Sequence, residues 1–385
     1  MPPVAFRTRE ELEDFRVWEL PSIEPCGEGT HLFLTVEKRG IPTTEAARRL
    51  ARALDLQPAQ VGFAGRKDAR AVTVQRMSVE HVDESRVRGL ELPGLRVLHV
   101  VRHSRKLRLG QLRGNRFEIL LRGLDAADRE HLEQALELLQ RHGLPNHFGF
   151  QRFGRNGLAH ELGRLLIQRR PADYLRALAS PTHAGDDPAA GELALALAQD
   201  TRAAHRRSAR LVPRLESELA AVARQLARRP GDWDSAVRAV SKRTRRFHLS
   251  ALQSRVFQTV LVARMERGPS LDCLAVGDLP WSQDAEVPTG PLPGARGPLA
   301  QGAPGDVERA ALAAEGLELT DFAGLPGGLD PAGARRPLRV PLTELEIDPG
   351  REHCAQGVRL RFCLPPGSFA TTLLEELAKL YARVS

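Results

Sequence analysis

Alternating apolar positions predict extended segments in the first third of the chain. Residues 31–38 (HLFLTVEK) and 115–122 (NRFEILLR) place apolar side chains at every second position, which is the pattern of a strand with a buried face. Residues 61–79 (VGFAGRKDARAVTVQRMSV) have two extended runs separated by a glycine-rich turn. We therefore expect a strand, a tight turn and a second strand in this segment.

Helical periodicity follows the first of these strands. Pro42 opens a helix that Thr43 or Thr44 can cap. Its apolar stripe consists of Ala46, Ala47, Leu50, Ala51 and Leu54. Residues from about 155 to 270 also have mainly helical patterning, with basic clusters at 202–210 and 242–246. A helix-rich region is therefore expected in the middle of the chain.

Strand patterning returns near residue 335. Leu338, Val340 and Leu342 alternate, and residues 358–364 (VRLRFCL) predict a further strand. A final helix, capped by Ser368, has one apolar face that consists of Leu373, Leu374, Leu377, Leu380 and Tyr381. Residues 283–306 are rich in Gly, Pro and Ala and have little periodicity, so we expect a long loop or a set of turns there.

The order of these segments predicts a two-part α+β architecture. The 385 residues exceed the roughly 250–300 residues at which a single core stops growing. The chain is strand-rich, then helix-rich, then strand-rich again. We therefore expect one domain built from residues 1–142 and 338–385, with a helix-rich domain inserted at residues 143–337.

Composition and charge favour a polyanionic partner. The composition is that of an ordinary globular protein, with 42% hydrophobic and 27% charged residues. The formal net charge is +8 and the pI is near 9.9. A basic excess attracts and holds phosphates, which makes nucleic acid a candidate partner.

Cysteine usage and hydropathy indicate a cytoplasmic protein. Cys26, Cys273, Cys354 and Cys363 lack the close spacing of a zinc or redox site. Free thiols in a large chain are typical of a reducing compartment. The charged N-terminus is unlike a signal peptide, and no run of about 18 apolar residues predicts a membrane span.

The segment 65–68 (GRKD) contains the sharpest candidate for chemistry. Gly62 and Gly65 let the backbone turn tightly and approach a ligand. Asp68 follows Lys67, and a carboxylate near cations stays ionised and can serve as a nucleophile or base. The alternative is a plain turn in which Asp68 hydrogen-bonds the backbone and Lys67 is solvated.

Five blocks, in order along the chain, resemble the motifs of TruD-type tRNA pseudouridine synthases. Gly65, Lys67, Asp68 and Ala71 match the Gly-x-Lys-Asp-x-x-Ala stretch that holds the family's catalytic aspartate. The other four blocks are residues 13–17, residues 105–117, residues 145–154 and residues 364–371. The inserted region, residues 160–335, matches only loosely. The resemblance implies a mixed, mainly antiparallel sheet of the pseudouridine-synthase type with an inserted TRUD domain.

The resemblance also implies roles for individual residues. Phe15, Asn115 and Phe369 would line the uridine pocket, with Phe117 near the target base. Lys67 and Arg9, beside the catalytic Asp68, are predicted to contact the substrate as well. Buried core positions are the alternative for the phenylalanines, since Phe117 shares a face with Ile119 and Leu121, and a Gly-Asn turn is the alternative for Asn115.

The family places a basic side chain next to the aspartate, just before its Glu-Asp-Phe motif. Here Arg7 and Arg9 are both candidates, and Arg9 is the one we choose. The segment REELEDF (residues 9–15), which ends in this motif, lacks the proline that the family has before its glutamate and carries extra residues.

The reaction that the resemblance implies is the isomerisation of uridine 13 in the D arm of tRNA. Pseudouridine formation needs no redox change and no external group, so we expect neither cofactor nor metal. The carboxylate could attack the anomeric carbon or remove a sugar proton to give a glycal. The target base would have to be flipped out of the folded RNA.

Two other functions fit parts of the sequence. An RNA-binding protein or chaperone on the same fold would use the basic surface without chemistry, although it would have no need of the GRKD segment. A phosphodiester-cleaving nuclease would need clustered acidic residues to hold two metal ions, and the sequence has no such cluster.

Overall fold

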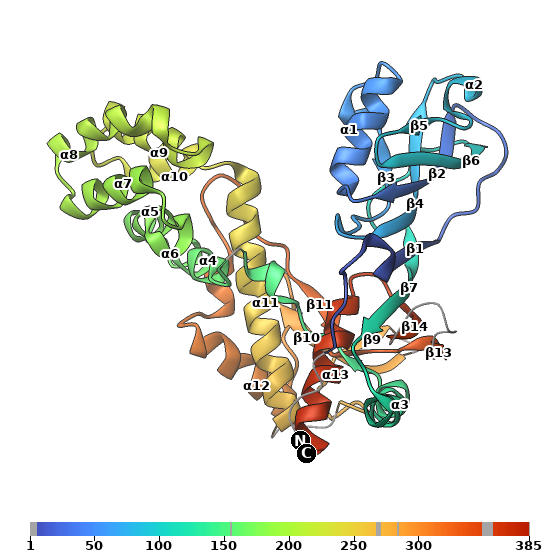
Figure 1. Cartoon of the computed structure of the whole chain (residues 1–385). Coiled ribbons are helices and arrows are strands. Elements are labelled where there is room, and N and C mark those ends of the chain that lie inside the picture. Colours follow the sequence, from blue (N-terminus) through green and yellow to red (C-terminus); the bar gives the residue numbers. More distant parts are fainter. Residues whose placement is uncertain (1–5, 155, 267–270, 283–284, 349–356, 385) are drawn as a thin grey trace. The chain divides into compact units, whose positions relative to one another are not determined.

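The structure, a computed structural model, describes residues 6–154, 156–266, 271–282, 285–348 and 357–384 (Figure 1). Two compact units divide the chain: unit 1 comprises residues 1–144 and 340–385, and unit 2 comprises residues 145–339. The chain leaves unit 1 at β8 (Leu144–Pro145) and returns at β12 (Arg339–Val340). The sequence placed these boundaries at 142/143 and 337/338. Among the described helices, none combines the length and apolar character needed to cross a membrane.

Unit 1 is built around one large mixed sheet. Its strands are β1 (Phe15–Pro21), β2 (His31–Arg39), β3 (Gly62–Phe63), β4 (Val72–Glu80), β5 (Glu91–Leu92), β6 (Leu95–His103), β7 (Leu112–Arg122), β13 (Thr343–Asp348) and β14 (Gly357–Leu364). The order is β13-β14-β7-β1-β4-β2-β6-β5, and β3 pairs with β4 off this path. Of the described pairings in this sheet, only β1–β4 is parallel. The sheet therefore joins both ends of the chain, as expected.

Helices cover one face of this sheet at two places. They are α1 (Thr43–Ala53), α2 (Glu84–Val87), α3 (Ala126–His142) and α13 (Ala370–Val384), with 3-10 turns η1 (Leu12–Asp14) and η2 (Pro58–Gln60). Helix α1 packs its alanines and Leu50 on Leu34 and Met77 of β2 and β4. Helices α3 and α13 pack on β1, β7 and β14 around Phe117 and Ile119. Each cluster is the hydrophobic core of one half of the sheet.

Two buried polar side chains, Lys38 and Thr73, lie where these two cores meet. Strand register aligns Lys38, Thr73, Val17, Phe117 and Phe362 across the sheet on the same face. Lys38 and Thr73 are as completely buried as their apolar neighbours. Buried polar groups are stable only when they find partners. The surroundings of Lys38 and Thr73 are therefore the part of unit 1 in which a functional site is expected.

Unit 2 is mainly helical. Its elements before the strands are η3 (Phe150–Phe153), α4 (Ala159–Ile167), α5 (Pro171–Ala179), α6 (Pro181–Ala184), α7 (Pro188–Gln199), α8 (Arg202–Arg207), η4 (Ser208–Arg214), α9 (Ser217–Arg228), α10 (Trp233–Ala239) and α11 (Lys242–Glu266). They are followed by β9 (Pro280–Ser282), β10 (Ala285–Leu292), α12 (Gly302–Ala314), η5 (Leu319–Phe322) and β11 (Ala334–Pro337). The expected helix-rich α+β insertion is confirmed for the described residues.

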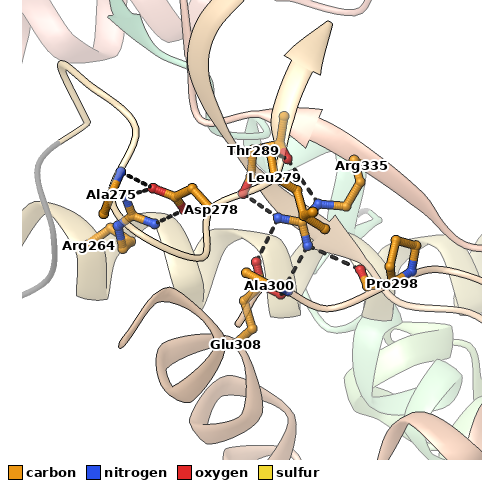
Figure 2. Close-up of polar contacts among 9 residues, drawn as sticks. All are labelled: Arg264, Ala275, Asp278, Leu279, Thr289, Pro298, Ala300, Glu308 and Arg335. Atoms are coloured by element: carbon orange, nitrogen blue, oxygen red, sulfur yellow. Dashed lines mark hydrogen bonds and ion pairs between the residues drawn. The ribbon is translucent and has the colours of Figure 1, made fainter. Parts of the chain in front are cut away.

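Two arginines connect helices of unit 2 to the small sheet β11-β10-β9 and to the segment before it (Figure 2). Arg264 of α11 forms a two-bonded pair with Asp278, at 2.8 and 3.0 Å. Arg335 of β11 reaches both carboxylate oxygens of Glu308 in α12, at 2.7 and 2.9 Å. Bidentate arginine–carboxylate pairs of this kind fix the relative orientation of the two side chains as well as their distance.

Three local expectations need correction. The segment 283–306, expected to be a long loop or a set of turns, contains β10 (Ala285–Leu292) and the start of α12 (Gly302–Ala314). Pro304 lies in the first turn of α12, where a missing N–H costs nothing, and strand β10 is held by its partners in spite of two prolines. Neither Thr43 nor Thr44 caps α1, because the helix begins at Thr43 and Pro42 occupies the N-cap position. The Thr43 hydroxyl bonds to Gln75. The predicted contacts of Leu380 and Tyr381, like those of Cys354, lie outside the described side chains.

Candidate active site

The GRKD segment runs between β3 and β4 and is fastened to the sheet by a chain of hydrogen bonds. The Lys67 backbone N–H donates to the Thr43 hydroxyl at 2.8 Å, and that hydroxyl donates to the Gln75 side-chain oxygen at 2.8 Å. The Gln75 amide nitrogen in turn donates to the carbonyl of Gly65 at 3.2 Å. The hydroxyl expected to cap a helix therefore positions the loop that carries Asp68.

Lys67 points away from solvent, into a buried ion pair. Its ammonium donates to Glu19 at 2.7 Å, and the two side chains are 4% and 1% exposed. The other Glu19 oxygen accepts the backbone N–H of Arg76 at 3.1 Å. Gly65 is required by close approach, because a side chain there would begin 2.9 Å from the Lys67 ammonium. The buried Lys67–Glu19 pair therefore anchors the GRKD loop to the sheet.

Lys38 is a site residue that sequence reasoning missed. Its buried ammonium donates to the carbonyls of Ile41 at 2.9 Å and Asp68 at 2.6 Å. Burial lowers the pKa of Lys38 to about 8, against the attraction of the nearby Asp68 charge. The sequence does contain an indication of this role. Lys38 follows Leu32, Leu34 and Val36 at every second position, so it lies on the buried face of the strand, where a lysine needs a specific partner.

Asp68 itself lies at the surface of this anchored loop. Its Oδ2 accepts a hydrogen bond from Arg9 Nη2 at 2.9 Å, and the two side chains are 47% and 20% exposed, respectively. Oδ1 has no hydrogen-bond partner among the described residues. Arg9 thus fixes one oxygen of the carboxylate, and the other oxygen can still accept a hydrogen bond from a ligand or react with it.

The arginine beside Asp68 is Arg9, and Arg7 lies elsewhere. The Arg9 guanidinium stacks 3.9 Å from the centroid of the Phe15 ring, a favourable cation–π arrangement. Its backbone φ is +62°, an uncommon conformation for a residue with a side chain. Arg7 instead pairs with Glu10 at 2.7 Å. The choice between the two arginines needed the three-dimensional structure, because they are only two residues apart.

Two of the candidate phenylalanines lie in the core. Phe15 and Phe117 are buried and meet edge to face at 6.2 Å between ring centroids, and Phe117 also stacks on Phe362 at 5.3 Å. Phe15 is connected to Asp68 through Arg9, which covers its ring. These two rings therefore pack beneath the site as core residues. Core packing was the alternative to a ligand-binding role that the sequence left open for the phenylalanines.

Asn115 has an unsatisfied acceptor atom, and Phe369 is partly exposed. Asn115 pairs with Glu19 across β1 and β7, one row beyond Phe117. Its side-chain oxygen is buried and has no hydrogen-bond partner in the described structure. Such an orphaned acceptor is costly unless a water or ligand satisfies it. Phe369, just before α13, leaves 43% of its surface exposed.

Within the described ranges, no three histidine, cysteine, aspartate or glutamate side chains are grouped so that they could hold a metal ion. The ionisable groups of the site are Asp68, Arg9, Lys38 and the buried Lys67–Glu19 pair.

The sheet assembled from both chain ends, with its helix-rich insertion and its loop-borne carboxylate, has the fold of a pseudouridine synthase. The family model described as tRNA pseudouridine synthase D (TruD) matches residues 1–288 and 281–377. The chain belongs to this TruD family of tRNA pseudouridine synthases, which confirms the family predicted from the five sequence blocks.

Relatives from bacteria and archaea cover nearly the whole chain. "tRNA pseudouridine synthase D" of Geobacter metallireducens is 41% identical over 98% of this chain and 96% of its own length. "Probable tRNA pseudouridine synthase D" of Methanopyrus kandleri is 34% identical over 91% of this chain and 86% of its own. The crystal structure of the putative tRNA pseudouridine synthase D from Methanosarcina mazei matches with a TM-score of 0.77 and 26% identity, over 98% of this chain and 94% of that one.

Proposed function

We propose that this tRNA pseudouridine synthase converts uridine 13 in the D arm of tRNA to pseudouridine, with Asp68 as the catalytic carboxylate and the target base flipped out of the RNA. One observation carries the proposal: Asp68 is anchored from below yet open at Oδ1. The position in the tRNA rests on the resemblance to the family and is the finer part of the proposal.

The reaction is an isomerisation in which the atoms balance without a co-reactant. The bond from uracil N1 to the ribose C1′ breaks, the base turns, and C5 bonds to C1′. The proton that leaves C5 is matched by one gained at N1. Asp68 can attack C1′ or remove the C2′ proton to give a glycal, and both routes need an ionised carboxylate within reach of the sugar.

The neighbours of Asp68 have separate tasks in this proposal. Arg9 fixes Oδ2 and leaves Oδ1 directed to the sugar. Lys38, Thr43 and the Lys67–Glu19 pair hold the loop so that the carboxylate is already placed when the nucleotide arrives. Asn115 supplies a side chain for the base edge, and Phe369 offers an exposed ring for stacking.

Chemical mapping of pseudouridine in unmodified tRNA transcripts tests the proposal. Incubation with the chain is expected to yield one modified uridine, at position 13, whereas the Asp68→Asn variant should yield none while binding the same transcripts. A modified uridine outside the D arm would overturn the assignment of the target. Full turnover by Asp68→Asn would overturn the catalytic role, and RNA binding without any product would favour the non-catalytic alternative.

A further inference from the structure

Unit 2 contains a hollow of about 160 Å³ between η3, α4, α5, α6 and the first turns of α11. Residues that line it include Phe153, Asn156, Leu162, His183, Phe247 and His248. One water molecule takes about 30 Å³ of liquid, so the hollow is large enough for a planar ring. We call these six residues and the space they bound the base hollow.

The His248 ring has a polar atom, Nε2, that makes no hydrogen bond within the described part of the chain. Its Nδ1 lies 3.1 Å from the hydroxyl of Tyr174, which is itself fully buried. Burial lowers the pKa of His248 to about 4, so the ring is neutral at pH 7, and burial also raises the pKa of Tyr174. The Tyr174 hydroxyl has no other partner among the described residues, so it donates to Nδ1, and the ring proton is then on Nε2.

This Nε2–H is a hydrogen-bond donor that the protein leaves unused. No described residue accepts it, and His248 as a whole is 5% exposed. This N–H is open to the hollow, so a ligand that lies there can accept a hydrogen bond from it. Because His248 lines the base hollow, a ligand there would present an acceptor atom.

Phe247 provides an aromatic surface beside this donor. It is 37% exposed, which is unusual for a phenylalanine in a helix of a packed unit. Gly154 faces it, and even a methyl group at Gly154 would lie 3.9 Å from the Phe247 ring. Gly154 therefore lies close to the ring, and the exposed part of Phe247 is the surface on which a ligand can stack.

Cations with free side chains surround the same helical turn. Lys242, Arg243 and Arg246 are exposed and make no hydrogen bond or ion pair in the described part of the chain. Arg243 lies one turn before Phe247 and so on the same side of α11. By contrast, Arg245 is buried and donates to the carbonyl of Val240 at 3.0 Å. Free cations next to an exposed ring are the combination that binds single-stranded nucleic acid.

We propose that the base hollow binds one unpaired nucleobase of the RNA substrate, stacked on Phe247 and accepting a hydrogen bond from His248, with a phosphate near Arg243. This inference rests on the proposed function, because it takes RNA as the ligand. It adds a nucleotide-binding site in unit 2 that is built from residues of unit 2 alone. A protein side chain as occupant would leave the three cations without counter-charges.

Binding and footprinting of an unmodified tRNA transcript by the full chain test this site. The Phe247→Ala variant should bind the transcript about tenfold more weakly or worse, as expected for loss of one base–aromatic stack, and Phe247→Trp should restore binding. One unpaired nucleotide should lose its reactivity toward base-modifying reagents with the unaltered protein and regain it with Phe247→Ala. Thermal unfolding of each variant shows that the fold is retained.

Val262→Ala is the matched control, because Val262 is an exposed apolar residue on the same helix, about 22 Å along its axis from Phe247. If Phe247→Ala binds and protects the transcript as Val262→Ala does, the base hollow is not a nucleotide site. Failure of the proposed function has a different signature: the protein would protect a nucleotide at the base hollow and yet yield no pseudouridine.

Discussion

Two arginine–aspartate pairs in this protein have the same chemistry and opposite surroundings. In unit 1, Arg9 reaches one oxygen of Asp68, and both side chains are partly exposed. In unit 2, Arg264 reaches both oxygens of Asp278, whose Oδ2 also accepts the backbone N–H of Ala275 (Figure 2). These two side chains are 1% and 0% exposed. The unit 2 pair is saturated and serves the fold, whereas the unit 1 pair is left incomplete and serves a ligand.

The largest expected effect is on catalysis, from the open carboxylate. Asp68→Asn should lower the single-turnover rate of pseudouridine formation by roughly 10³-fold or more, because the amide cannot act as nucleophile or base. Asp55→Asn is the matched control, since Asp55 is an exposed aspartate of unit 1 paired with Arg86, and it should keep the full rate. Equal rates for the two variants would end the distinction between the two pairs.

The saturated pair should instead determine stability. Asp278→Ala leaves the buried Arg264 charge without its partner and should lower the free energy of unfolding by about 3–5 kcal/mol. Denaturant unfolding measures this loss. The double variant Arg264→Met with Asp278→Leu should recover much of it, because no buried charge remains. A single variant as stable as the unaltered protein would show that the pair does not hold unit 2 together.

Acid should weaken unit 2 through His248. Its pKa in the folded chain is about 4, below the ordinary 6.5, so between these values the unfolded chain binds the proton and the folded chain does not. Stability therefore falls as pH drops from 6.5 towards 4, by up to about 1.4 kcal/mol per pH unit. Thermal unfolding at pH 7.5 and 5 measures the loss. His248→Gln should reduce it, whereas His99→Gln, at an exposed histidine, should not.

Arg9 should have a smaller effect, and on rate more than on stability. Arg9→Gln removes one charge-assisted hydrogen bond, worth about 1.5–3 kcal/mol, so the single-turnover rate should fall about 10- to 100-fold. Partly exposed ion pairs contribute only about 0–1 kcal/mol to folding, so the unfolding midpoint should hardly move. Arg7→Gln is the control, two residues away and paired with Glu10. A large loss of stability in Arg9→Gln would make this pair structural like that of unit 2.

Secondary structure could be predicted from the sequence where the hydrophobic periodicity is strong. The prediction failed where tertiary packing determines the conformation of a segment. The alternation in residues 31–38 and 115–122 corresponds to β2 and β7, because a half-buried strand needs apolar groups at every second position. Residues 285–292 and 302–314 have no such pattern, and they form β10 and α12 through contacts with the rest of unit 2.

The family, the α+β class and the candidate loop around Asp68 follow from local residue order alone, since period and motif are properties of neighbouring residues. Which charged groups are saturated was decided by the tertiary structure. Arg9 is 59 residues from Asp68 and Glu19 is 48 residues from Lys67, and Lys38 meets the Asp68 carbonyl only because β2 and β4 pair beside the loop. Periodicity specifies the face on which a side chain lies, and only packing brings a partner within hydrogen-bonding distance.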